Sequence, residues 1–218
     1  MTGRKRRDYK KVLQKVNTLL SEPKVTTFVV DFEVGLWQAL RQVYTAPDIK
    51  GCAFHFGQAM WRKCQEIGLG TAYVSMRVYK LIRKCFELPL LQPADIRPAF
   101  GKIKEKGQSE QLAPFFAYVE NTWLTNNVWA VENWSVYGRS VRTNNDVEGW
   151  HNRLNRRAKK GNLLFYLLIT LLFDEAKEVP MQFKLIKEKK LHRHQSRQTR
   201  ATQGRLCATW DRYGKKRD

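Results

Sequence analysis

Hydrophobic residues near the start of the chain follow the pattern of a small parallel β-sheet. The run Val25 to Val30 is rich in β-branched residues, which predicts a strand buried on both faces and ending at Asp31. Apolar positions over 36–43 then follow helical spacing, and residues 49–54 predict a second short strand. Strand, helix and strand in this order favour a parallel βαβ unit.

Most of the remaining chain carries apolar residues at the three- and four-residue spacing of helices. One stripe, formed by Val12, Val16, Leu19 and Leu20, precedes Pro23, which is expected to end its helix. Three further stripes lie between residues 56 and 138, and they are Met60, Cys64 and Ile67, then Val78, Ile82 and Cys85, then Leu112, Phe115, Val119 and Trp123.

These patterns predict an α/β fold with four parts. Residues 1–55 form a partial α/β core, 56–138 an all-helical insertion, 139–183 helices that return to the core, and 184–218 a basic helical tail. The longest apolar run, Leu163 to Phe173, is shorter than the ~20 residues of a membrane-spanning helix. It predicts a buried helix, so we expect no contact with a membrane.

Charge changes this picture more than overall composition does. The chain has 218 residues, 43% of them hydrophobic, which is enough for a globular core. Its formal net charge is +20, and such an excess of Lys and Arg attracts polyanions by releasing counterions. Nucleic acid is therefore the leading partner, and a merely soluble basic protein is the alternative.

The cysteines indicate a reducing, intracellular environment. Cys52, Cys64, Cys85 and Cys207 show no disulfide spacing, and no apolar signal region follows the basic start of the chain. Cys52 and His55 have half of a zinc motif, but a closed site needs about four ligands, so we expect no zinc. Instead, these two side chains are expected to pack or to form hydrogen bonds close to Asp31.

The segment Arg142 to Asn152 concentrates polar groups at a predicted helix start. One face of that helix would carry Asn145, Glu148, Asn152 and Asn155, and the opposite, packed face would carry Val147, Trp150, Leu154 and Ala158. Asn145 and Glu148 also have the spacing of a capping box, so Glu148 has either a chemical or a capping role.

Taken in order, several motifs resemble the transposase domain of Mutator-like elements. They are Asp31 to Glu33, Gly51 to Ala59, Trp134 to Tyr137 and Arg142 to His151, and the resemblance covers residues 1 to about 185. It implies a ribonuclease-H-like core interrupted by a helical insertion. It also implies a cut-and-paste transposase in which two aspartates and a glutamate hold Mg²⁺ or Mn²⁺.

The resemblance assigns roles to individual residues. Asp31 is similar to the second catalytic aspartate and Glu148 to the catalytic glutamate, and both would be metal ligands. Cys52 and His55 match a Cys-x-x-His motif expected beside the active site, and Asn145 and His151 belong to the motif around Glu148. His151 could orient Glu148 or contact phosphate, with packing or solvation as equal alternatives.

One expected feature of the family is missing. Its first catalytic aspartate precedes the part of the domain that matches this chain, and Asp8 has the position of a helix N-cap rather than a ligand. We therefore expect an incomplete core, an unpaired edge on the strand that ends at Asp31, and little or no cleavage activity.

The resulting hypothesis is a fragment of a cut-and-paste DNA transposase that is inactive in strand cleavage. The alternative is a non-catalytic DNA-binding protein derived from a transposase. Either would bind duplex DNA, with possible self-assembly on DNA ends and no small-molecule substrate. The residues expected to contact DNA are Arg142, Arg153, Arg156, Arg157, Lys159 and Lys160, together with the basic strip over 184–217. The family, and basic clusters at 3–7 and 215–217, indicate the nucleus.

Overall fold

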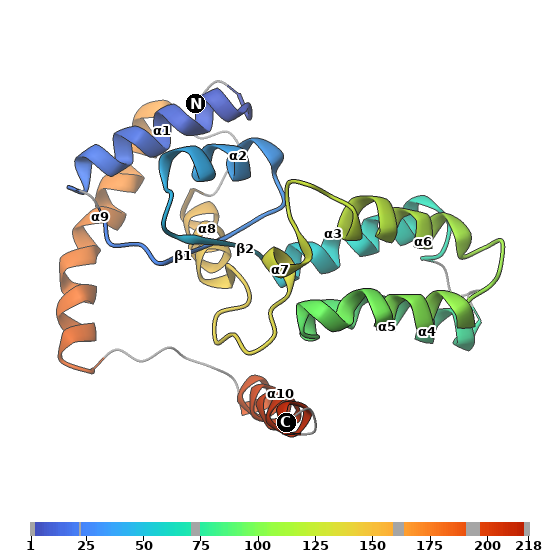
Figure 1. The fold of residues 1–218 in the computed structure, drawn as a ribbon. Helices are drawn as coiled ribbons and strands as arrows, with labels where there is room; N and C mark the ends of the chain where they lie inside the picture. Colours follow the sequence, from blue (N-terminus) through green and yellow to red (C-terminus); the bar gives the residue numbers. More distant parts are fainter. Residues whose placement is uncertain (1–2, 22, 71–74, 159–163, 191–196, 216–218) are drawn as a thin grey trace. The chain divides into compact units, whose positions relative to one another are not determined.

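The computed structural model describes residues 3–21, 23–70, 75–158, 164–190 and 197–215 (Figure 1). The chain divides into two compact units, Met1–Asn144 and Asn145–Asp218, which are considered separately below. The described residues are mostly helical, and they contain one parallel sheet of two strands.

The predicted βαβ unit is present in the first unit. Strand β1 (Thr27–Val30) leads through helix α2 (Val34–Val43) into strand β2 (Asp48–Gly51), and the parallel register places Val30 opposite Gly51. Strand β2 ends earlier than predicted. A Cβ atom on Gly51 would lie 2.2 Å from Cζ of Phe32, so this position next to the ring requires glycine.

The prediction that β1 is buried on both faces is wrong. Thr27 is exposed, and Phe28, Val29 and Val30 are only half-buried. Among the described residues the sheet has two strands, so one edge of β1 is left without a partner strand. The edge of β2 away from β1 differs, because Nδ2 of Asn133 donates to its Ile49 carbonyl at 3.0 Å.

Helix α1 (Arg6–Leu19) packs against α2, but not through the predicted apolar stripe. Leu13 is half-buried against the core, whereas Leu19 is 67% exposed. The start of the chain comes close to α2 at Gly35, where a Cβ atom would lie 2.6 Å from the Arg4 carbonyl oxygen. This glycine therefore permits the close approach.

Asp8 was predicted to be the N-cap residue of α1, but it occupies the third helical position. Lys5 is the N-cap residue, and its backbone N–H donates to Oδ2 of Asp8 at 3.2 Å. The carboxylate thus satisfies a donor at the helix start from within the first turn.

The all-helical prediction for residues 56–138 agrees with the structure. The elements are α3 (Ala53–Glu66), α4 (Met76–Glu87), the 3₁₀ turn η1 (Leu88–Leu90), α5 (Pro93–Lys106), α6 (Ala113–Val119), the π turn η2 (Glu120–Leu124) and α7 (Val131–Trp134). Cys52 is the N-cap residue of α3, so His55 belongs to the first turn of a helix rather than to a strand end.

Aromatic rings from the sheet region and from the helices meet in one core. The ring of Trp123 lies 4.6 Å, centroid to centroid, from Phe32 and also from Phe56. Trp134 donates from Nε1 to the Trp123 carbonyl at 3.1 Å. The predicted α/β core and the predicted insertion therefore share a single hydrophobic core.

The second unit contains helices α8 (Asn145–Ala158), α9 (Phe165–Lys187) and α10 (Arg197–Gly214). The apolar start of α9 was expected to be buried, yet Phe165 is 69% exposed and Phe173 is 60% exposed. Within this unit α9 meets α8, a mostly polar helix with no buried residue, which leaves much of the apolar surface of α9 uncovered. In the described part of the chain, no helix is both long and apolar enough to cross a membrane.

Candidate active site and nucleic-acid interface

The carboxyl ends of β1 and β2 bring the motif residues of the first unit together. Asp31 directly follows β1 and Cys52 directly follows β2, and parallel strands place both positions at the same edge of the sheet. The backbone N–H of Cys52 donates to the Val30 carbonyl at 2.9 Å, which continues the ladder to this point. In α/β folds this edge is the common place for a ligand or active site.

The Asp31 carboxylate is held from two sides. Its Oδ1 lies 2.8 Å from Nδ1 of His55, and it accepts a hydrogen bond from Nδ2 of Asn144 at 2.9 Å. The Asp31 carbonyl accepts from Nε1 of Trp37 at 2.7 Å, so the backbone is anchored as well. The side chain of Asp31 nevertheless remains 47% exposed, and a ligand can still reach it. The expected proximity of His55 and Asp31 is therefore observed.

Asn144 joins Cys52 to Asp31, a role that the motif comparison missed. The Cys52 thiol is 3.1 Å from Oδ1 of Asn144, while the amide group of Asn144 donates to Asp31. Nearby, the backbone N–H of Ala53 donates to the Arg142 carbonyl at 2.9 Å. Segment 142–144 is thereby fixed beside the strand ends. Its place at the start of the polar segment is the sequence signal that could have singled out Asn144.

A second carboxylate, Glu33, lies two residues beyond Asp31 at the N-cap of α2. Burial raises the pKa of Tyr9, on α1, to about 12, and a hydrogen bond with Glu33 contributes further. One oxygen of this carboxylate, Oε1 of Glu33, is buried without a hydrogen-bond partner in the described structure. Glu33 belongs to the Asp31–Glu33 motif but was given no role, and Tyr9 was not predicted, since only the fold brings α1 to this position.

His55 and Asn144 are the polar neighbours of the Asp31 side chain. Within the described ranges, no three His, Cys, Asp or Glu side chains are grouped so that they could hold a metal ion. Asp31 and Glu148 belong to different units, so their predicted metal-binding partnership remains a prediction.

The motif residues of the second unit lie on the first two turns of α8. Helix α8 begins at Asn145 itself, so Asn145 is not the cap residue that the proposed capping box with Glu148 requires. Glu148 is half-buried and makes contacts of its own, while His151 is exposed and its ring centroid lies 5.2 Å from that of Trp150. The role of Glu148 is thus not explained by this capping box.

Helices α8 and α9 are joined by a cluster around Glu175, another residue that the sequence did not indicate. Glu175 is only 6% exposed, and its carboxylate accepts hydrogen bonds from Arg153 at 2.5 Å, from Nε1 of Trp150 at 3.1 Å, and from Arg157. The hydrogen bond from Arg153 is the largest cause of a lowered pKa at Glu175. The predicted packed face of α8 is found only in part, since Leu154 and Ala158 are half-buried but Trp150 is 37% exposed and Val147 is 51% exposed.

Of the arginines predicted to bind DNA, Arg153, Arg156 and Arg157 lie on α8, whereas Arg142 belongs to the first unit. Arg153, Arg156 and Arg157, with Gly149 and Asn152, line an open hollow of about 400 Å³. Arg153 and Arg157 remain 50% and 38% exposed while they contact Glu175, and Arg156 is exposed. Two other predicted contacts, Lys159 and Lys160, lie outside the described residues.

Comparisons with protein-family models, curated proteins and solved structures find no match to this chain. Its function therefore has to be argued from its own residues.

Proposed function

We propose that this protein binds duplex DNA through the arginine face of α8, as part of a cut-and-paste transposase. The observation that carries this proposal is the hollow formed by Arg153, Arg156 and Arg157. Guanidinium groups bind phosphate oxygens in two-point hydrogen bonds, and phosphate contacts supply most non-specific DNA affinity.

Glu175 supports this use of the arginines. It holds Arg153 and Arg157 from beneath while both remain partly exposed, so less side-chain freedom is lost when they bind a phosphate. Arg153 and Arg157 contact Glu175, and Glu178 lies 3.8 Å from Arg157, while Arg156 adds a further positive charge to the lining of the hollow. The net charge of +20 extends the attraction to the whole chain, since long-range charge accelerates association with polyanions.

The transposase origin rests on the motifs and on their placement. The βαβ unit would belong to a ribonuclease-H-like core, with Asp31 at the carboxyl end of β1. His55, Cys52 and Asn144 surround this aspartate, as the resemblance leads one to expect for the Cys-x-x-His motif. Such an origin would place the protein in the nucleus.

DNA affinity measured over a range of salt concentrations tests the proposal. Arg156→Gln removes one phosphate contact without disturbing Glu175, so the slope of log K against log salt should become shallower by about 0.9. Arg83→Gln is the matched control, because Arg83 is an exposed arginine on α4 in the first unit. An affinity for duplex DNA weaker than ~10⁻⁴ M at physiological salt would rule out the proposal.

Metal-dependent cleavage is the second candidate, favoured by the half-exposed Asp31 carboxylate and the unsatisfied oxygen of Glu33. If Mg²⁺ or Mn²⁺ binds there, it would activate water for attack on a phosphodiester. Nicking of supercoiled DNA that requires Mn²⁺ and disappears in both Asp31→Ala and Glu148→Ala would support this activity. Equal nicking by all three proteins would indicate a contaminating nuclease.

A further inference from the structure

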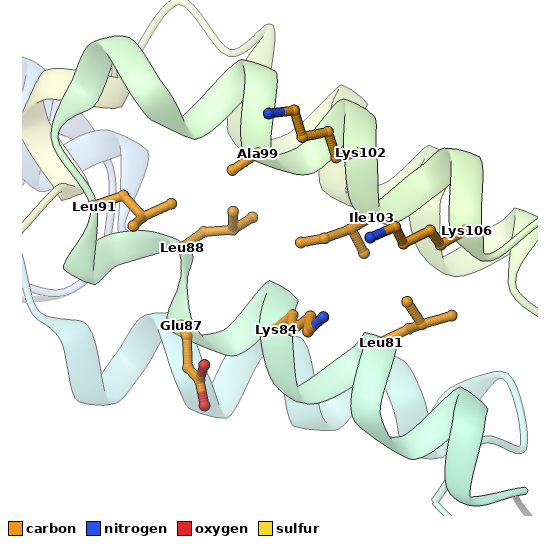
Figure 2. A pocket seen from close by; sticks show the side chains of 9 residues that line it. All are labelled: Leu81, Lys84, Glu87, Leu88, Leu91, Ala99, Lys102, Ile103 and Lys106. Carbon is orange, nitrogen blue, oxygen red and sulfur yellow. The ribbon is translucent and has the colours of Figure 1, made fainter.

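A pocket between α4 and α5 has no part in the proposed DNA binding. It encloses about 320 Å³ and lies wholly within the first unit, where the two helices run side by side from the turn at η1 (Figure 2). Its inner wall is aliphatic, with the buried side chains of Leu81, Leu88 and Ile103. The volume is at the lower end of the ~300–1,000 Å³ typical of small-molecule sites.

Three lysines surround this aliphatic wall. Lys84 comes from α4, and Lys102 and Lys106 from one side of α5. In the described structure none of their ammonium groups belongs to an ion pair. The one acidic residue of the lining, Glu87, lies near the η1 end and is 4.0 Å from Arg83. The pocket is therefore apolar inside, with positive charge at its mouth.

We propose that this pocket binds a small amphipathic carboxylate with an aliphatic body, such as a medium-chain fatty acid. The apolar chain would lie along Leu81, Leu88 and Ile103, and the carboxylate would meet the lysine ammonium groups. Leu81 lies on α4 and Leu88, seven positions further along the chain, begins η1, so the apolar wall is about 10 Å long. Burial of the chain supplies the affinity, and the lysines select an anion.

Two features separate this ligand from the other anions that a basic protein meets. The lining contains no aromatic ring, whereas single-stranded nucleic acid is normally held by stacking of its bases on aromatic side chains. The volume is also small, so it suits one alkyl chain better than the side of a peptide helix.

Titration of the full chain with decanoate tests the proposal. Binding is followed by NMR through the ¹³C-labelled methyl groups of the protein. We expect saturable shifts at Leu81, Leu88 and Ile103. Acetate, which lacks the alkyl chain, and decyltrimethylammonium, which reverses the charge, should cause no such shifts. Following these three residues also separates the pocket from binding to the exposed apolar side chains of α9.

Two variants connect the binding to the pocket. Replacing Lys84, Lys102 and Lys106 by Gln should weaken decanoate binding about 10-fold, as expected for three partly exposed ion pairs. The matched control replaces Lys10, Lys11 and Lys15 on α1, and it should leave the affinity unchanged. Ala99→Phe should abolish binding, because it places a ring in the cavity next to Lys102.

Circular dichroism checks that each variant is folded, and the lysine variant decides the outcome if Ala99→Phe does not fold. Decanoate affinity that is the same in the wild type and the lysine variant would overturn the proposal. Failure of decanoate to bind, together with binding of an acidic amphipathic peptide, would overturn it in favour of a protein partner.

Discussion

Each of the two units of this protein is stabilised internally by a different kind of side chain. At the centre of the first unit, the rings of Phe32, Phe56 and Trp123 are packed at centroid distances of 4.6 Å. At the centre of the second unit, the carboxylate of Glu175 joins α8 and α9 through two arginines and a tryptophan. Packed rings tolerate changes of pH and salt, whereas an ionic cluster responds to both.

This difference suits the proposed division of roles. The aromatic core fixes the ends of β1 and β2, where Asp31, Cys52 and His55 need a rigid support. The ionic cluster instead presents charge at a surface, and its arginines can exchange part of their contact with Glu175 for contact with a phosphate. The comparison can be tested by weakening each centre separately.

The largest effect is expected from Trp123→Ala in the aromatic core. Trp123 is 2% exposed, and loss of its ring should lower the free energy of unfolding by about 3–5 kcal/mol. Urea denaturation followed by far-UV circular dichroism measures this change. The control is Trp61→Ala in the same unit, because Trp61 is 46% exposed and should change the free energy by less than ~0.5 kcal/mol. Similar losses in both variants would contradict a core centred on Trp123.

A smaller and local effect is expected from Glu175→Gln in the ionic cluster. Arg153 is already 50% exposed and stays solvated without its partner, so pairing of α8 with α9 should weaken without unfolding the first unit. Hydrogen exchange measured by mass spectrometry should show lost protection in α8 peptides. Glu178→Gln is the control, since Glu178 is 52% exposed and 3.8 Å from Arg157, and it should lose little protection.

The same cluster should depend on pH. The pKa of Glu175 is lowered from its ordinary value of 4.5, so its contribution to stability is complete above pH 4.5 and is lost as the pH falls through the lowered pKa. The difference in α8 protection between the wild type and Glu175→Gln should therefore disappear once the pH falls below the lowered pKa of Glu175. A difference that persists there would mean that Glu175 acts through packing rather than charge.

The smallest effect is expected from Asp31→Asn at the strand ends. The Asp31 side chain is 47% exposed, so loss of its charge beside His55 should change the free energy of unfolding by less than ~1 kcal/mol. Urea denaturation of this variant can be compared with that of Asp48→Asn, an exposed acid paired at 3.6 Å with Lys50. A loss above about 2 kcal/mol for Asp31→Asn would assign this carboxylate a structural role.

Much of the first unit follows from local patterns. The β-branched run before Asp31 and the apolar spacing over 36–43 were sufficient to predict β1, α2 and β2, because strand and helix periods are short-range properties. The helices between residues 56 and 138 were predictable for the same reason. The position of His55 was not, because a boundary between strand and helix depends on where the ladder ends, here at Gly51 beneath Phe32.

The candidate sites were only partly predictable. The sequence indicated Asp31, Cys52 and His55, since polar groups that follow buried strands stand out. Asn144 and Glu33 lay within the motifs without a role, and Tyr9 lay outside them. The contact of Asn144 with Asp31 and that of Tyr9 with Glu33 join segments distant in the sequence. Glu175 was hidden for a related reason, as an acid within a long helix is usually solvated.

The sequence alone determined the net charge of the protein, the helical and strand periods and the order of the motifs, because these depend on residue identity and short-range geometry. Only the tertiary structure decided which groups meet: Asn144 between Cys52 and Asp31, and Glu175 beneath two arginines. It also decided that the start of α9 is exposed although its sequence is apolar. Burial and long-range pairing depend on which elements pack together, and the pattern of one segment does not contain that information.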